Sequence, residues 1–237
     1  MATRLAAVVV EAHDVRELAR FWARALGWRD AGDGVVRPEA GGAVELEFVA
    51  SARPKSAKNR LHLDLSGGDD QAGAVERLLA LGARRADIGQ GDVPWEVLAD
   101  PEGNEFCVLP GADAAGGLAQ ICQDAADPAG QGRFWAAATG WSITEQGDWG
   151  VRLQPAPGVA PSLVMGPPVA AKSAVNRVQF VLAAQERGDA EERGDAEDCQ
   201  AGLIAAGAVR TADPCVFADP DGNEFRLDGG WRRGGTP

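Results

Sequence analysis

Several residue types that would support particular chemistries are missing or scarce in this sequence. It contains no tyrosine, which excludes tyrosine-based acid–base chemistry, and it has only two histidines, His13 and His62. Its four cysteines form no C-x-x-C pair. Their even number allows two disulfides, but we recognise no secretory signal and therefore expect reduced thiols.

Long apolar runs are also missing. The N-terminal stretch has six apolar residues in a row, Leu5 to Val10, before Glu11 interrupts them. That run is too short for a membrane span or for the apolar part of a signal peptide, so we expect a cytoplasmic protein.

Positive charge is scarce as well, and no stretch is rich in lysine or arginine. Lys and Arg number 23 against 35 Asp and Glu, which gives a net charge of −12. Such a chain repels polyanions, so nucleic acid and anionic membrane surfaces are poor partners. With 45% hydrophobic residues in 237, the chain has the composition of a globular protein of one large or two small domains.

An internal repeat organises the chain. Phe21-Trp22-Ala23 recurs as Phe134-Trp135-Ala136, at an offset of 113 residues. The segment 55–60 recurs at 172–177, and the segment 100–106 recurs at 219–225. Three ordered matches at nearly constant offset indicate two homologous halves. We predict one domain at 1–111, a turn-rich linker at 112–117, a second domain at 118–230 and a C-terminal tail at 231–237.

Each half is predicted to contain a strand, a helix and three strands, and then a strand, a helix and further strands. Asp14 is a suitable N-cap for the first helix and Gly27 a suitable end. A second helix is expected at 75–81, and strands at 8–10, 44–49, 61–65, 95–99 and 105–109. A six-residue duplication, 186–191 followed by 192–197, is best explained as a slippage tolerated in a solvated loop or at the start of the last helix.

Strand alternation predicts which side chains share a face. In the strand at 44–49 the apolar residues must face the helices, which leaves Glu45 and Glu47 on the other side. The same argument places His62 and Asp64 on that second face of the strand at 61–65. In the strand at 105–109, Glu105 and Cys107 are predicted to lie on the second face as well. The second face is therefore expected to be strongly acidic.

These motifs resemble the vicinal oxygen chelate superfamily. The resemblance rests on the opening strand with its "FW..ALGW" helix, the "NRLHLDL" strand and the "DPEGNEF" turn. That group includes glyoxalase I, extradiol dioxygenases, fosfomycin resistance proteins and bleomycin-binding proteins. The resemblance implies an α+β fold of two tandem domains, each of paired βαβββ modules with a curved mixed sheet around a cavity. It also implies that the halves pair as a built-in dimer, in a tandem type common in actinobacteria.

The resemblance implies metal-ligand positions that this chain fills poorly. In the first half they fall on Ala7, Glu45, His62 and Cys107, and in the second half on Gln120, Ser162, Gln179 and Arg226. In the arrangement of glyoxalase I, where a site mixes opposite halves, Gln120 and Ser162 would instead face His62 and Cys107, which is an even poorer set. Ala7 cannot bind a metal, and Arg226 places a positive charge where a cation would sit. We therefore expect no metal cofactor, and a divalent ion such as zinc has only Glu45, His62 and Cys107 as candidate ligands.

Several residues allow two interpretations. His62 is either a ligand or a hydrogen-bonded strand histidine, and we favour the second. Arg60 and Arg177 can clamp an anionic group or form salt bridges between domains. Trp95 can stack on a ligand or pack between domains. Glu105 and its repeat Glu224 are expected to bind turn amides. Trp22 and Trp135 are expected in the core.

The main functional hypothesis is a binding module that takes up a small organic ligand, for example by sequestering a toxic or antibiotic-like compound. An acidic cavity favours a cationic or amine-bearing ligand. The alternative is a divergent metal-dependent lyase, isomerase or dioxygenase, so whether the protein is an enzyme stays open. A third alternative is an idle scaffold for protein association. The expected ligand-binding residues are Glu45, Glu47, His62, Asp64, Trp95, Glu105, Cys107, Gln179 and Arg226.

Overall fold

The computed structural model describes residues 3–39, 44–111, 117–167, 169, 172–185 and 192–228. The predicted linker other than Gly117, the C-terminal tail at 231–237 and the first copy of the duplication at 186–191 lie outside the described residues. The second copy begins α4, the last helix.

The expected order of elements is confirmed in both halves. The first half contains β1 (Thr3–Ala12), α1 (Val15–Leu26), β2 (Arg29–Gly32), β3 (Val35–Arg37), β4 (Glu45–Ala50), β5 (Leu61–Ser66), α2 (Gln71–Ala80), β6 (Arg84–Arg85), β7 (Glu96–Ala99) and β8 (Glu105–Leu109). The second half contains β9 (Leu118–Asp124), α3 (Pro128–Thr139), β10 (Ser142–Gly147), β11 (Gly150–Gln154), β12 (Ser162–Gly166), β13 (Val178–Ala184), α4 (Glu192–Ala205), β14 (Val209–Arg210), β15 (Val216–Ala218) and β16 (Glu224–Asp228).

The first helix of each half is bounded by local signals that the sequence predicts. The Asp14 carboxylate accepts a hydrogen bond from the Glu17 backbone N–H at 2.9 Å, and Gly27 ends α1 at φ +68°. Asp127 and Gly140 bound α3 in the same way. A side chain at the N-cap satisfies a free amide, and only glycine adopts a positive φ at low cost. Among the described helices, none has both the length and the apolar character needed to cross a membrane.

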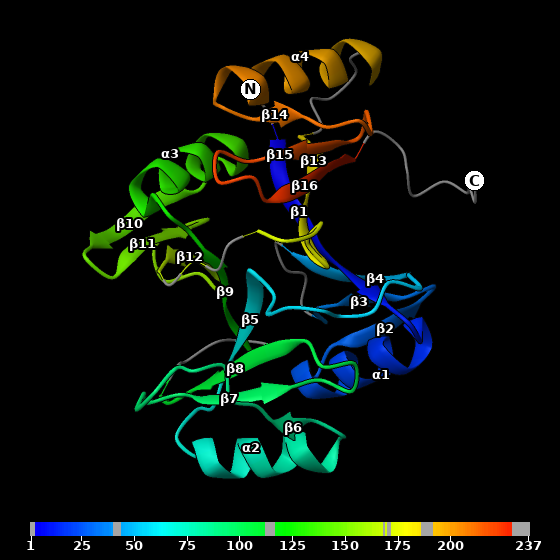
Figure 1. Ribbon diagram of the computed structural model, residues 1–237, viewed down its shortest axis with the longest axis vertical. Helices are drawn as coiled ribbons and strands as arrows, with labels where there is room; N and C mark the ends of the chain where they lie inside the picture. The colour runs from blue at the N-terminus through cyan, green and yellow to red at the C-terminus, as the bar shows by residue number, and fades with distance from the viewer. Residues whose placement is uncertain are drawn as a thin grey trace.

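The described strands form two mixed sheets of eight, and each sheet takes strands from both halves (Figure 1). Sheet A has the order β14-β15-β16-β13-β1-β4-β3-β2, and sheet B has the order β10-β11-β12-β9-β5-β8-β7-β6. The halves meet in the middle of each sheet through an antiparallel pair, β1 with β13 and β5 with β9. This is the paired-module α+β fold that the resemblance implied, with the two halves paired inside one chain.

The core lies between the helices and the apolar faces of the sheets. Trp22 on α1 packs edge-to-face against Phe21 and against Phe106 of β8. Its repeat Trp135 on α3 packs against Phe180 of β13 and Phe225 of β16. Both tryptophans are buried, as predicted. Each half therefore has its own aromatic core, although its strands belong to two different sheets.

Candidate functional site

The polar side chains predicted for one cavity lie on two different sheets. Glu45 and Glu47 belong to β4 in sheet A, whereas His62 and Asp64 belong to β5 in sheet B. The expectation of a single acidic cavity in the first half is therefore wrong. The physical reason is that β4 forms its ladder with β1 and β3, while β5 pairs with β8 and with β9 of the other half.

The metal candidate set is separated for the same reason. Cys107 lies on β8 next to β5, so it accompanies His62 and not Glu45. Glu45 instead pairs with Arg37 of β3, with 2.9 Å between the Glu45 Oε1 and the Arg37 Nε. Glu45, His62 and Cys107 therefore do not form one ligand set.

Sheet A carries a pocket that we call the sheet A pocket. It has about 500 Å³ of empty space, counted with its opening to solvent. Its lining consists of Val9, Glu47, Val181, Asp213, Cys215, Arg226, Leu227 and Asp228. The lining thus contains three carboxylates, one guanidinium and several apolar side chains.

The family's metal positions on sheet A do not fit a metal. Register brings together Ala7, Glu45, Gln179 and Arg226 through β1, β4, β13 and β16. Arg226 donates from its Nε to the Gln179 Oε1 at 3.1 Å, so a fixed positive charge lies beside the remaining donors. A cation placed there would meet Coulomb repulsion and lack a ligand at Ala7.

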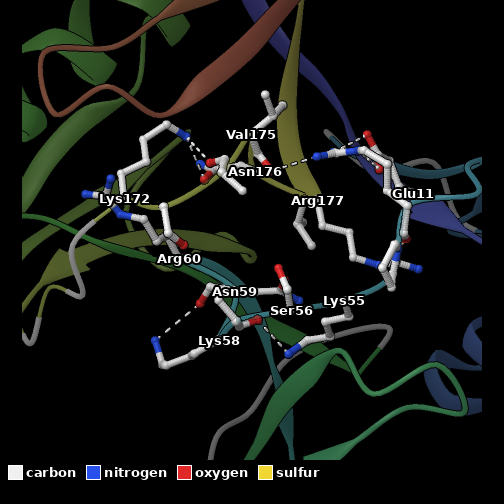
Figure 2. A pocket seen from close by; sticks show the side chains of 16 residues that line it. Glu11, Lys55, Ser56, Lys58, Asn59, Arg60, Lys172, Val175, Asn176 and Arg177 are labelled. Carbon is white, nitrogen blue, oxygen red and sulfur yellow. Dashed lines mark hydrogen bonds and ion pairs between the residues drawn. The ribbon is translucent and has the colours of Figure 1, made fainter.

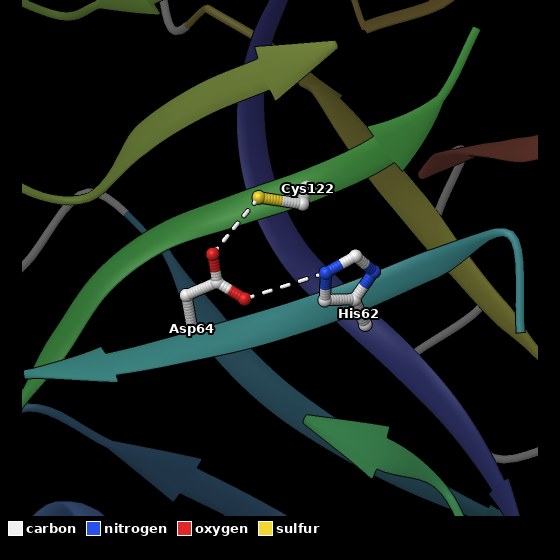
Figure 3. A group of neighbouring side chains, drawn as sticks. All are labelled: His62, Asp64 and Cys122. Carbon is white, nitrogen blue, oxygen red and sulfur yellow. Dashed lines mark hydrogen bonds and ion pairs between the residues drawn. The ribbon is translucent and has the colours of Figure 1, made fainter. Parts of the chain in front are cut away.

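Sheet B carries a polar cluster centred on Asp64, which we call the Asp64 cluster (Figure 3). Asp64 is buried, and its Oδ2 accepts hydrogen bonds from the Gln120 amide at 2.9 Å and the Cys122 thiol at 3.1 Å. The His62 Nε2 lies 3.4 Å from the Asp64 Oδ1. Cys122 comes from β9 of the other half, directly opposite His62 in the antiparallel ladder.

The donor atoms of this cluster suit a borderline divalent metal. One ligand atom from each of His62, Asp64 and Cys122 lies within 4.8 Å of the others. The His62 Nδ1 and the Asp64 Oδ1 are buried and have no hydrogen-bond partner among the described residues. Imidazole nitrogen, carboxylate oxygen and thiolate sulfur are the three ligand types of protein zinc sites. The residues fit such an ion in donor chemistry.

The cluster is displaced from the positions that the family resemblance implied. On sheet B those positions are Gln120, Ser162, His62 and Cys107. The Arg152 guanidinium binds the side chains at two of these positions. It donates to the Gln120 Oε1 at 2.7 Å and to the Ser162 Oγ at 2.9 Å. Asp64 and Cys122 each lie two residues further along their strands than His62 and Gln120, on the same face. Any metal bound here would use a shifted ligand set.

The two thiols of sheet B are held in their protonated form. Burial raises the pKa of both the Cys107 and the Cys122 thiol, and the negative charge of Asp64 raises both further. The thiolate is the reactive species, so neither group is a nucleophile at neutral pH. This agrees with the sequence argument that Cys107 is not a catalytic nucleophile.

The protonated thiols lead to a prediction about alkylation. Treatment of the native, metal-free protein with iodoacetamide at pH 8 is expected to modify the exposed Cys215 and to leave Cys107 and Cys122 unmodified. Peptide mass spectrometry measures the sites. Cys215→Ser is the control, which should remove the native reaction, and denaturation should make Cys107 and Cys122 reactive. Rapid native modification of Cys122 would contradict the protonated state.

The remaining predicted residues lie outside both sites. Trp95 precedes β7 and is 37% exposed, and it is neither a lining residue of the sheet A pocket nor a member of the Asp64 cluster. Glu105 binds the Lys55 ammonium at 2.5 Å and the Asn59 backbone N–H at 3.2 Å. Glu224 makes the equivalent contacts to Lys172 and Asn176. Both glutamates thus fix loops, in line with the expected binding of backbone amides.

Sequence reasoning missed several residues of these sites. Alternation along β9 and β11 would have indicated Cys122 and Arg152, because Cys122 is two residues from Gln120. The same rule, applied to the strands of sheet A, would have indicated Val9, Val181 and Asp228 as lining residues of the sheet A pocket. Asp213 and Cys215 lie before β15, outside regular structure, and no local pattern marks them.

Two sheets built from paired βαβββ modules, with polar side chains on one face of each, define a tandem protein of the vicinal oxygen chelate class. The chain belongs to the glyoxalase-like domain family, whose family model matches residues 7–109 and 120–227.

Solved structures share this fold. Glyoxalase I from Zea mays is 18% identical with a TM-score of 0.65, covering 95% of this chain and 92% of that chain. A proposed dioxygenase from Bacillus subtilis is 15% identical with a TM-score of 0.59, covering 95% of this chain and 84% of that chain. At these identities the likeness establishes the fold. A search of curated proteins found no match.

Proposed function

We propose that this protein binds a small organic molecule carrying an amine in the sheet A pocket. The observation that carries the proposal is the acidic lining of this pocket, which also includes Arg226 at a position where the family resemblance implies a metal ligand. Sequestration of a toxic or antibiotic-like compound is the concrete form of this function.

Charge and apolar surface together define the ligand class. Glu47 is buried at the pocket wall, and Asp213 and Asp228 add further negative charge against the single Arg226. A carboxylate in a low-dielectric wall attracts an ammonium group more strongly than one in water does. The side chains of Val9 and Val181 supply an apolar surface for the rest of the ligand. A partly apolar primary amine therefore complements this pocket.

A matched pair of probes tests the proposal. Phenethylamine is expected to bind the protein more tightly than 3-phenylpropionate, which has similar size and opposite charge. Glu47→Gln should lower the affinity for phenethylamine by about tenfold, because a charged interaction of about 1.4 kcal/mol is lost. Isothermal titration calorimetry measures both affinities.

Glu45→Gln is the control for this experiment, because Glu45 lies on the same strand but does not line the pocket. It should leave the amine affinity unchanged. Preferential binding of the carboxylate, or an equal loss in both variants, would contradict an amine site at Glu47.

A second candidate function is metal-dependent chemistry at the Asp64 cluster, favoured by the approach of His62, Asp64 and Cys122 within 4.8 Å. A bound divalent metal would supply Lewis-acid polarisation of a substrate carbonyl. The residues themselves would hold the ion, with Gln120 orienting Asp64 through its amide and Arg152 orienting Gln120 in turn. Because the two candidate sites lie on different sheets, a test of one does not depend on the other.

A further inference from the structure

A pocket separate from both sites lies between the two repeated loops at 53–60 and 172–178 (Figure 2). It has about 630 Å³ of empty space, counted with its opening to solvent. We call it the interloop pocket. Six of the residues that line it are cationic and one, Glu11, is acidic.

Five of these six cations have a carboxylate partner. The ion pairs are Arg53–Glu11 at 2.7 Å, Lys55–Glu105 at 2.5 Å, Lys58–Asp124 at 2.9 Å, Lys172–Glu224 at 2.6 Å and Arg177–Glu102 at 2.6 Å. Arg60 is the sixth cation, and it has no ion pair with any described residue. Arg60 therefore gives the pocket one positive charge that no ion pair neutralises.

Comparison with its repeat explains why Arg60 is unpaired. Arg177 reaches Glu102 in the turn of the first half, and the Glu102 carboxylate also accepts hydrogen bonds from the backbone N–H groups of His13 and Asp14. The equivalent turn residue of the second half is Asp221, one methylene shorter. Its carboxylate accepts from the Ala126 N–H at 2.7 Å. Among the described residues, the Arg60 guanidinium donates only to the Asp221 backbone carbonyl, at 3.3 Å.

The environment of Arg60 makes this difference costly. Its side chain belongs to a residue only 8% exposed, and its Nε is buried without a hydrogen-bond partner among the described residues. The Nε of Arg177 is likewise unpartnered, but Glu102 neutralises that guanidinium. Asp124 is the carboxylate whose field reaches Arg60, and Lys58 already binds both its oxygens, at 3.0 and 2.9 Å. A buried charge without a direct ion pair is unfavourable.

We propose that the interloop pocket binds a small oxyanion, a phosphate or a carboxylate, through the Arg60 guanidinium. The planar guanidinium offers two parallel N–H donors to such a group, and a buried setting strengthens the contact. The sequence left open whether the repeated arginines clamp a ligand or join the domains. Arg177 joins the halves through Glu102, and Arg60 is assigned to the anion. The residues that line this pocket belong neither to the sheet A pocket nor to the Asp64 cluster.

Inorganic phosphate and acetate are the probes for this site. At constant ionic strength set with chloride, at least one of the two anions is expected to raise the Tm of the wild-type protein in a saturable way. Comparing the two anions distinguishes phosphate from carboxylate recognition. Arg60→Gln should weaken the binding at least about tenfold.

Asp221→Glu provides the decisive variant because it keeps Arg60 in place. The longer carboxylate should reach Arg60 as Glu102 reaches Arg177, and so compete with the anion and remove its effect on Tm. Circular dichroism checks that each variant is folded, and Asp221→Glu alone decides the matter if Arg60→Gln does not fold. The same anion effect in Asp221→Glu as in the wild type, or no saturable effect of either anion on the wild type, would overturn the proposal.

Discussion

Replacing Trp135 by alanine is expected to lower the free energy of unfolding by about 3–5 kcal/mol. The Trp135 side chain is fully buried at the centre of the second half's aromatic core. Its ring centroid lies 4.6 Å from that of Phe180 and 5.4 Å from that of Phe225, and the two phenylalanines belong to neighbouring strands of sheet A. The substitution removes the burial of a large ring and leaves a cavity that the surrounding strands cannot fill.

Chemical denaturation monitored by circular dichroism measures this loss. Trp149→Ala is the matched control, because Trp149 is 46% exposed and its ring lies 5.9 Å from the Arg152 guanidinium. Trp149→Ala should lower the free energy of unfolding by no more than about 1 kcal/mol. Equal effects of the two substitutions would contradict the position of Trp135 in the core.

Addition of Zn²⁺ to the reduced protein at pH 8 is expected to give one bound ion per chain at the Asp64 cluster. His62→Ala and Cys122→Ser should each abolish stoichiometric binding, since each removes one of three ligands. Equilibrium dialysis with elemental analysis measures the bound ion. Cys199→Ser is the control, because Cys199 is a buried cysteine on α4, outside the cluster.

The pH dependence gives this test a second readout. Because the pKa of the Cys122 thiol is raised, a proton must leave the sulfur before it can bind an ion. The zinc affinity should therefore rise by about tenfold per pH unit between pH 6 and pH 8. If the wild type takes up no zinc at pH 8, or Cys122→Ser binds it unchanged, the cluster is only a hydrogen-bonded network and the metal-dependent candidate fails.

Local patterns were sufficient for much of the fold. The caps at Asp14 and Gly27 act within one helical turn, and strand alternation depends only on neighbouring residues. The repeat then predicted that the second half copies the first, as α3 and β13 show. Which side chains share a face of a strand was also predictable, since His62 and Asp64 lie on the same face of β5.

The sequence by itself thus determined the elements, the two halves, the aromatic cores and the side of each strand that carries polar groups. The tertiary structure alone decided which strands share a sheet. It separates Glu45 from His62, brings Cys122 opposite His62 and leaves Arg60 facing the shorter Asp221. Such pairings join residues far apart in the chain and depend on how whole sheets bury their apolar faces, which no local pattern encodes.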